Sequence, residues 1–404
     1  MAQNSKLRKV SSNVPSYRYA RRAEVLGKSV FDHAPGAIVL NSGLAHPPLL
    51  PDVAREAARA AEERTAEVMQ YGPLMGLDDL RDAVASFVFE DGVRCERDNI
   101  LITNGAKHGV DLACRVFVEP GDRVIVTAPT YMTSMQHMRT HGASFLAIPQ
   151  DEEGLMTEVL EANLDRLVAN GERMPKLLFD VPDFHNPTGI TMSLRRRKRL
   201  IELAMAYGFV ILEDDPYRRV RFEGEPVPPL KALDETGVVF ALGTVSKILS
   251  PGLRLGWVIG EPSAVRRMAM QKSEGGSCPF AQRIVVDLMR SNRMAEHIDL
   301  ISEKMREHRD VMVEALAKEL PDAVVRPPQG GYFLWAELPE GVLGEAVAER
   351  AVEHGVEVSS GRLSFPEDDP GNYLRFAYSY PDADEIIEGV RRLGLAYREV
   401  CGRA

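Results

Sequence analysis

The stretch of sequence that decides the fold lies at residues 243–257 and reads Gly-Thr-Val-Ser-Lys-Ile-Leu-Ser-Pro-Gly-Leu-Arg-Leu-Gly-Trp. An apolar run at 238–242 precedes it, and another short apolar run at 256–260 closes it. Short apolar runs bounded by glycine and proline are typical of strands that are covered on both faces. Lys247 therefore follows a buried strand directly, and the apolar Ile248 and Leu249 beside it indicate an interior position for this lysine.

The same alternation of apolar runs and helical patterns extends toward the N-terminus. Strands that alternate with helices predict an α/β domain with a mostly parallel sheet. The expected strands are at 99–103, 123–127, 176–181, 209–213, 238–242 and 256–260, and the expected helices are at 51–65, 77–90 and 106–118.

The last third of the chain has a different pattern. Residues 289–320 are rich in Arg and Glu and predict one or two long amphipathic helices. Short apolar runs follow, together with one more helical pattern, and they predict a smaller α+β domain with an antiparallel sheet. The expected strands are at 331–335, 355–358 and 373–376, and the expected helix is at 345–354.

Composition excludes several classes of protein. The 404 residues carry 49 basic and 59 acidic side chains, and a net charge of −10 argues against a nucleic-acid partner. The basic run at 195–199 is therefore interpreted as a solvated helix face. No apolar stretch is long enough to span a membrane, and the N-terminus lacks the apolar segment of a secretory signal. The four cysteines lie far apart without metal-ligand spacing, which predicts reduced thiols, no metal site and a cytoplasmic location.

Polar residues follow several of the expected strands. Ligands of open α/β sheets bind beyond the carboxyl ends of the strands, so these residues are candidates for one site. They are Asn104-Gly105-Ala106-Lys107, Pro129-Thr130-Tyr131, Asn186-Pro187-Thr188-Gly189, Asp214-Asp215-Pro216-Tyr217 and Thr244-Val245-Ser246-Lys247.

These segments resemble pyridoxal-phosphate (PLP) enzymes of the aspartate-aminotransferase fold type. The most similar subgroup is the class I/II family with the 2-aminoadipate and kynurenine aminotransferases and the effector domains of MocR-type regulators. The resemblance covers roughly residues 35–395. The segments that carry it are Tyr-Gly-Pro-Leu-Met-Gly-Leu (71–77), Ile-Leu-Ile-Thr-Asn-Gly (100–105), Pro-Gly-Asp (120–122), Ala-Pro-Thr-Tyr (128–131), His-Asn-Pro-Thr-Gly (185–189), Glu-Asp-Asp-Pro-Tyr (213–217), residues 243–257 and Tyr-Leu-Arg-Phe (373–376).

The resemblance implies the PLP-dependent transferase fold type I. This fold has a large domain, with a mostly parallel seven-stranded sheet flanked by helices, and a smaller α+β domain. The implied parts are an N-terminal segment (1–48) that packs on the small domain and the pocket, a large PLP-binding domain (49–288) and a small C-terminal domain (289–404). It also implies a homodimer with composite active sites.

The resemblance assigns the catalytic groups to the ends of two strands. Lys247 is implied to hold the cofactor as a Schiff base and to shuttle a proton. Asp214 ends an apolar strand, where a carboxylate is costly to bury unless it meets a cation. The resemblance makes that cation the pyridine nitrogen of PLP, while Asp215 points the other way along the extended backbone. Tyr217 and Asn186 are implied donors to the phenolic oxygen of PLP.

The turn before residue 106 leads into a helix N-terminus, which favours an anion such as a phosphate. By resemblance, the phosphate site combines Gly105, the N–H groups of Ala106 and Lys107, the hydroxyls of Thr244 and Ser246, and the guanidinium of Arg254. Tyr131 resembles the residue that stacks on the cofactor ring, and the alternative is a tyrosine of the core. For Asn186 the alternative is that it only forms the turn before Pro187. Tyr71 matches the tyrosine that reaches the phosphate from the neighbouring subunit.

Substrate binding is implied at three positions. Arg375 resembles the clamp for the substrate α-carboxylate, with a surface salt bridge as the alternative. Gly43 and Asn186 match residues near the substrate. Arg18 or Arg21 could cap the pocket.

The sequence departs from the subgroup at three places. Gly43-Leu44-Ala45-His46 stands where Gly-Leu-Pro-Asp is usual, Ala106-Lys107 replaces Ser-Gln, and residues 271–280 differ throughout. The roles of His46, Lys107 and Lys272 therefore stay open, and Lys107 could bind the phosphate or point to solvent.

The implied function is that of an EC 2.6.1-type aminotransferase, which moves the amino group of an L-amino acid to a 2-oxo acid. The alternative is a PLP enzyme of the same fold with another carbanion reaction in specialised amino-acid metabolism, namely decarboxylation, elimination or replacement, cyclisation or oxidation. A regulator's effector domain is disfavoured, because about 40 residues before the matching region are too few for a winged helix. The sequence does not name the substrate, because loops form the side-chain pocket.

Overall fold

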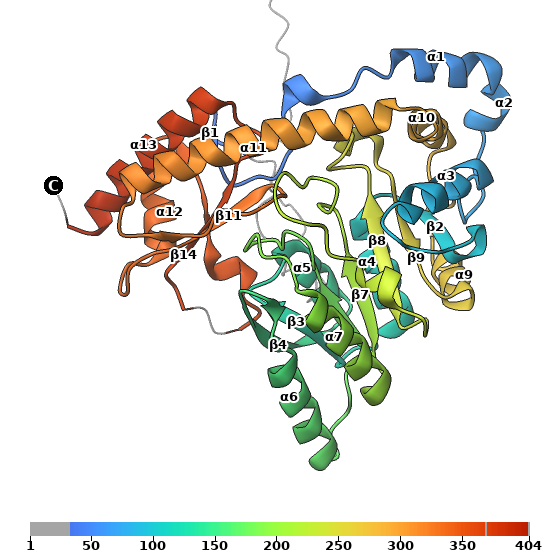
Figure 1. Cartoon of the computed structure of the whole chain (residues 1–404), viewed down its shortest axis with the longest axis horizontal. Helices are drawn as coiled ribbons and strands as arrows, with labels where there is room; N and C mark the ends of the chain where they lie inside the picture. Colours follow the sequence, from blue (N-terminus) through green and yellow to red (C-terminus); the bar gives the residue numbers. More distant parts are fainter. Residues whose placement is uncertain (1–32, 368–369, 403–404) are drawn as a thin grey trace, which may run out of the picture.

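The computed structural model describes residues 33–367 and 370–402, and its largest element is an eight-stranded sheet (Figure 1). The strand order is β2-β9-β8-β7-β6-β3-β4-β5. The strands are β2 (Ile100–Thr103), β3 (Arg123–Ala128), β4 (Ser144–Asp151), β5 (Gly154–Leu155), β6 (Leu177–Asp180), β7 (Val210–Asp214), β8 (Val239–Thr244) and β9 (Gly256–Ile259).

The sheet is mostly parallel, as the sequence predicts. Strands β8, β7, β6, β3 and β4 pair in parallel, and β9 runs antiparallel between β8 and β2. The sheet has eight strands rather than the expected seven, because the two-residue β5 turns back and pairs antiparallel with the end of β4.

Helices cover both faces of this sheet. On one face α4 packs against α5, α9, β8 and β9, and on the other α6 and α7 pack against each other and on β4 and β7. Successive residues of one strand therefore enter different cores, as Val124 and Ile125 of β3 do. The helices of this part are α1 (Ala54–Glu63), α2 (Thr65–Val68), α3 (Asp78–Phe89), α4 (Ala106–Phe117), α5 (Met132–Thr140), α6 (Thr157–Ala169), α7 (Leu194–Tyr207), α8 (Leu230–Leu233), α9 (Pro262–Met270) and α10 (Pro279–Met289).

The C-terminal part forms a smaller antiparallel sheet with the strand order β10-β11-β14-β13. The long helix α11 starts at Arg293, four residues after the expected start, and crosses the molecule toward this sheet, where it packs on α13 (Figure 1). The remaining elements are α11 (Arg293–Glu319), α12 (Gly344–Glu353), α13 (Ala383–Val400), β10 (Val324–Val325), β11 (Phe333–Glu337), β12 (Val356–Glu357), β13 (Ser359–Ser360) and β14 (Tyr373–Ala377).

The described part of the N-terminal segment packs on the C-terminal part. Strand β1 (Ile38–Val39) pairs in parallel with β12, and Leu40 exchanges main-chain hydrogen bonds with Glu357 and Ala377. This brings Gly43 to the turn after β8, where its main-chain oxygen accepts a hydrogen bond from Lys247. The division into parts at 48/49 and 288/289 stays a prediction.

The interpretation of residues 195–199 as a solvated helix face is wrong for two of the five side chains. Arg196 and Arg197 are buried in α7. Arg197 donates to the main-chain oxygens of Met192 and Pro182 and pairs with the buried Asp183 at 2.9 Å. Buried arginines persist where carboxylates and carbonyls occupy their donors, and net charge does not reveal such partners.

Within the described residues, no helix is both long and apolar enough to cross a bilayer. The four cysteines are free thiols.

Candidate active site

The expected polar segments meet at the carboxyl ends of neighbouring strands. In the sheet register Thr103 of β2 and Thr244 of β8 both lie opposite Gly256 of β9, and Asp214 of β7 lies opposite Leu242 of β8. The turns that follow β2, β7 and β8 are therefore adjacent in space.

Lys247 lies in the turn after β8, and its ammonium donates a hydrogen bond to the main-chain oxygen of Gly43 at 2.6 Å. Burial lowers the pKa of Lys247 to about 8, and the positive charges of Lys107, Arg375 and Arg254 act in the same direction. Asp214 opposes this effect. A lysine with such a pKa is neutral in a large fraction of molecules near pH 8, so its amine can act as a nucleophile or base.

Asp214 is 5% exposed, and its Oδ1 has no hydrogen-bond partner among the described residues. Burial raises the pKa of Asp214 to about 7; the neighbouring Asp215 adds to the rise, whereas Lys107 and Lys247 oppose it. Asp215 instead faces away and accepts a hydrogen bond from Arg218 at 2.7 Å. A buried carboxylate oxygen without a donor needs a ligand that brings one.

The turn at 104–105 forms an anion cradle at the N-terminus of α4. Gly105 has a φ of +83°, and a side chain here would meet the guanidinium of Arg254. A Cβ at Gly256 would lie 2.9 Å from the nitrogen of Ala106, so only glycine lets β9 approach the start of α4 this closely. The first N–H groups of a helix have no intrahelical partner and point at a bound anion.

Arg254 and two hydroxyl groups border this cradle. Arg254 is exposed, has a φ of +52°, and donates to the main-chain oxygen of Asn104 at 3.2 Å. The hydroxyl of Thr244 lies 3.0 Å from that of Ser246. Arginine, two hydroxyls and free amide groups are a donor set suited to a phosphate.

The side chain of Lys107 faces the site, although the sequence leaves its direction open. Its Nζ lies 5.8 Å from the centre of the Tyr131 ring. Its positive charge acts on both Asp214 and Lys247. A cation in the first turn of a helix is disfavoured by the helix dipole, and an anion bound at this end of α4 would offset that cost.

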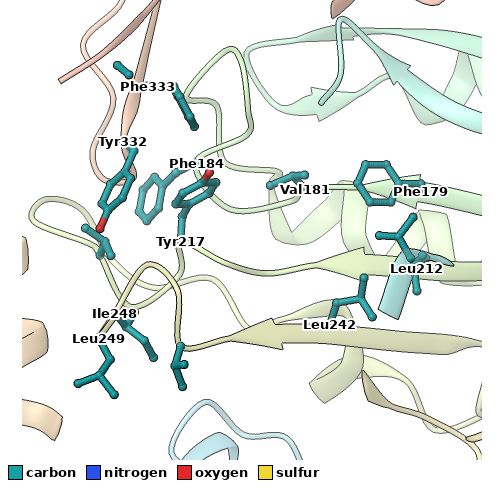
Figure 2. Close-up of a cluster of buried hydrophobic side chains, with 14 of the residues drawn as sticks. Phe179, Val181, Phe184, Leu212, Tyr217, Leu242, Ile248, Leu249, Tyr332 and Phe333 are labelled. Carbon is teal, nitrogen blue, oxygen red and sulfur yellow. The ribbon is translucent and has the colours of Figure 1, made fainter. Parts of the chain in front are cut away.

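Tyr217, Asn186 and Tyr131 lie around the same space. Tyr217 and Asn186 are buried, and Tyr131 caps α5. Burial raises the pKa of Tyr217 well above its usual value, so its hydroxyl remains a donor. The ring of Tyr217 packs edge-on against Phe333 at 5.9 Å, within the group of aromatic side chains that Figure 2 shows.

Arg375 reaches the site from β14 of the smaller sheet and is 5% exposed. Its guanidinium donates to the oxygen of Asn41 at 2.6 Å, to Oδ1 of Asn186 at 3.3 Å and to the hydroxyl of Ser359 at 3.3 Å. All of these acceptors are neutral, so a carboxylate would be a stronger partner for the charge.

Gly43 contacts both Lys247 and the aromatic Phe333. Its oxygen accepts from Lys247, and a Cβ at this position would lie 2.4 Å from Cζ of Phe333. Only glycine fits here without a shift of the aromatic ring.

The structure does not bring Tyr71 into the site of its own chain. Tyr71 is 88% exposed, and Met69 beside it is 78% exposed. The sequence leaves the roles of His46 and Lys272 open, and both side chains are held by main-chain oxygens. Nδ1 of His46 donates to the main-chain oxygen of Tyr380 at 2.9 Å, and buried Lys272 donates to the main-chain oxygens of Leu74 and Ile102. Arg18 and Arg21 lie outside the described residues.

Sequence reasoning missed Asn41, Ser359 and Tyr332. Asn41 and Ser359 hold Arg375, and the hydroxyl of Tyr332 donates to the main-chain oxygen of Lys247 at 2.7 Å. Tyr332 lies in an apolar run that predicts a buried strand of the smaller sheet. The preceding Gly330-Gly331 is the one signal in the sequence that the chain approaches another segment closely at this point.

The donor set fits PLP at three points. The orphaned Oδ1 of Asp214 suits a protonated pyridine nitrogen, the amine of Lys247 suits an aldehyde, and the start of α4 with Arg254 suits a phosphate. In the described part of the chain, no group of three or more His, Cys, Asp or Glu side chains could hold a metal ion.

Known proteins share this fold and sequence over nearly the whole chain. The family model for class I and II aminotransferases matches residues 36–393. An aromatic-amino-acid aminotransferase of Thermococcus litoralis is 39% identical over 84% of this chain and 82% of its own length.

Two crystal structures are similar throughout. Kynurenine aminotransferase of Pyrococcus horikoshii, in complex with PMP, has a TM-score of 0.89 at 34% identity, over 94% of this chain and 97% of that one. The α-aminoadipate aminotransferase LysN of Thermus thermophilus, complexed with N-(5′-phosphopyridoxyl)-L-leucine, has a TM-score of 0.87 at 34% identity, over 95% of this chain and 98% of that one. With its fold, its site and the match over residues 36–393, the chain belongs to the class I and II aminotransferases.

Proposed function

We propose that this protein is a PLP-dependent aminotransferase that moves the amino group of an L-amino acid to a 2-oxo acid, with Lys247 as the catalytic amine. The observation that carries the proposal is the pair of Lys247 and buried Asp214 at the ends of neighbouring strands, with Oδ1 of Asp214 unpartnered among the described residues. The family match and the PLP-derived ligands of its structural relatives support PLP as the cofactor.

PLP, when bound, supplies an aldehyde carbon that takes up the amino group and a ring that withdraws electrons from the substrate Cα. Asp214 holds a proton on the ring nitrogen, because an ionised carboxylate in a buried place stabilises the cation that it faces. Tyr217 and Asn186 donate hydrogen bonds to the phenolic oxygen. The cradle of Gly105, Ala106, Lys107, Thr244, Ser246 and Arg254 binds the phosphate.

Lys247 is both the attachment point and the acid–base group. Its lowered pKa leaves a large fraction of the amine unprotonated near pH 8, and this amine removes the proton from Cα of the amino acid. The oxygen of Gly43, 2.6 Å from Nζ, orients the amine. Gly43 itself lies near the substrate.

Arg375 binds the α-carboxylate of the substrate. The carboxylate exchanges for the neutral oxygens that Arg375 contacts, and a planar guanidinium can grip it with two parallel hydrogen bonds. This fixes the amino acid with its amino group toward Lys247.

We also propose a homodimer in which Tyr71 completes the phosphate site of the partner. The exposed Met69 and Tyr71 support this, because large apolar side chains are rarely left in water together without a partner surface. The cytoplasmic location stays a prediction, which fractionation of the native cells would test.

The test mixes holoprotein with single amino acids and no 2-oxo acid. An aminotransferase releases one 2-oxo acid per site and then stops, with a change in the cofactor absorbance. The panel contains aromatic amino acids, kynurenine and 2-aminoadipate, which the relatives' names suggest, together with alanine and aspartate. Adding a 2-oxo acid should then restore continuous turnover, and K247A should show neither step.

The alternative carbanion chemistry gives different products. Continuous turnover without a 2-oxo acid, release of carbon dioxide or ammonia, or uptake of oxygen would reject simple transamination.

A further inference from the structure

Tyr332 joins the smaller sheet to the catalytic lysine. Its hydroxyl donates to the main-chain oxygen of Lys247 at 2.7 Å, and its ring centre lies 5.4 Å from Nζ of the same residue. Tyr332 is 2% exposed, and its own main-chain oxygen accepts from Tyr378. One side chain thus touches Lys247 at both its backbone and its amine.

Both contacts bear on where the amine of Lys247 lies. The lysine side chain has four rotatable bonds and few directional constraints, so the peptide at its base and the surface along its stem set its position. The hydrogen bond fixes the peptide, and the electron-rich face of the ring attracts the ammonium.

The surroundings of Tyr332 leave little room for another conformation. Its ring packs against Tyr217 at 5.6 Å, and Figure 2 shows its hydroxyl directed toward the segment that carries Ile248 and Leu249. A small cavity of about 10 Å³, room for about one water molecule, lies between Tyr332, Lys247 and His46. A shorter side chain at 332 would enlarge this space directly behind the amine.

We propose that Tyr332 is a positioning residue for Lys247, which keeps the amine aligned with the substrate Cα during proton transfer. The inference rests on the proposed function, because it assigns a task to that same lysine. It also explains how the C-terminal part, which carries Arg375 on β14, acts on the lysine of the large sheet: Tyr332 directly precedes β11, the strand that pairs with β14.

A purely structural tyrosine is the competing explanation, and the chain offers a matched control. Tyr378 is fully buried, and its hydroxyl donates to the main-chain oxygens of Gly330 and Gly331 at 3.1 and 2.9 Å. Among the described residues, the partners of its hydroxyl are these two glycines and not Lys247. Y332F and Y378F therefore each remove one buried hydroxyl that is bonded to main-chain oxygen.

The experiment measures the first half-reaction of both variants by stopped flow, with substrate carrying hydrogen or deuterium at Cα. We expect Y332F to be slower by roughly tenfold, with a larger isotope effect and a half-saturating substrate concentration within about twofold of wild type. Y378F should keep the wild-type rate and isotope effect, while both variants melt at similar temperatures.

A second readout needs bound cofactor but no turnover. Y332M removes the ring as well as the hydroxyl, and the pH midpoint of the cofactor absorbance should move down by about half a unit, because the ring no longer stabilises a positive nitrogen. Y332F should keep this midpoint. The charges that act on this nitrogen, those of Lys107, Asp214, Arg375 and Arg254, are unchanged in both variants.

The proposal is overturned if Y332F and Y378F slow the half-reaction equally, or if the midpoint of Y332M stays at the wild-type pH. If the wild-type protein performs no half-reaction, the proposed function fails, and the midpoint still decides whether Tyr332 acts on the lysine.

Discussion

The amine of Lys247 and the main-chain oxygen of Gly43 lie 2.6 Å apart, although 204 residues separate them in the chain. An aromatic ring lies beside each of them. The ring of Tyr332 lies next to the amine of Lys247, and the ring of Phe333 lies next to Gly43. The geometry of the catalytic lysine thus depends on three distant segments of the sequence.

We expect G43A to lower kcat/KM by at least about tenfold. The new methyl group would lie 2.4 Å from Cζ of Phe333, so either the ring or the segment with the Gly43 oxygen must shift. Steady-state kinetics measure the loss, and F333L, which removes the clashing atoms, should restore part of it in the double variant. A double variant that is as impaired as G43A alone would contradict the steric cause.

Asp214 should destabilise the cofactor-free protein at neutral pH. Its pKa is about 7 in the folded protein and near 3.8 in an unfolded chain, so the folded state binds this proton more tightly. The protonated Asp214 therefore contributes to the free energy of unfolding most strongly below about pH 4. This contribution is lost as pH rises to about 7, and it amounts to at most roughly 4 kcal/mol.

D214N removes this titration. Cofactor-free D214N should therefore unfold at a higher temperature than cofactor-free wild type at pH 8, whereas cofactor should stabilise the wild type far more than the variant. Activity should fall by about 10²-fold or more, because the ring nitrogen loses its anionic partner. Calorimetry with and without PLP measures the melting temperature of the cofactor-free protein and the stabilisation by PLP. A variant that PLP stabilises as strongly as wild type would refute the pairing of Asp214 with the ring nitrogen.

Attachment of PLP to the cofactor-free protein should depend on pH through Lys247. The neutral amine is the nucleophile, so the attachment rate should rise with pH and level off above about pH 8. In K107M the midpoint should move to higher pH, because the positive charge that helps to keep the pKa of Lys247 low is gone. K107R keeps the charge and should keep the midpoint. An unchanged midpoint in K107M would place the Lys107 charge outside the site.

A homodimer with shared sites predicts complementation between two impaired variants. Y71A should lose roughly tenfold in activity without loss of folding, because the side chain is 88% exposed in its own chain. Mixing it with K247A after mild dissociation forms hybrids with one intact site, and random pairing recovers about a quarter of wild-type activity. Activity that stays at the mean of the two separate variants would show that each chain holds a complete site.

Much of the fold could be predicted because its strands are buried on both faces. The strands β2, β6 and β9 are buried throughout and mostly apolar, and the sequence shows these runs directly. Strand β4 mixes buried and exposed residues without regular alternation and escaped notice. Helix α13 was also missed, although Asp382 and Glu385 form a capping box that marks its start.

Some residues of the site could likewise be predicted from the sequence, whereas several of their contacts could not. Motif residues such as Lys247, Asp214 and Arg375 could be named from local sequence, and the structure brings them together. The direction of the Lys107 side chain, the burial of Arg196 and Arg197 and the contacts of Tyr332 depend on partners far away in the chain. No local pattern encodes such contacts, because packing between segments determines them.

The guanidinium of Arg375 carries its charge among the oxygens of Asn41, Asn186 and Ser359 before any substrate arrives. In the proposed function, capture of an amino acid replaces these neutral oxygens on Arg375 with the substrate carboxylate. A carboxylate forms charged hydrogen bonds with a guanidinium, which the neutral oxygens do not. The proposed pocket therefore favours ligands that carry a carboxylate over neutral ligands.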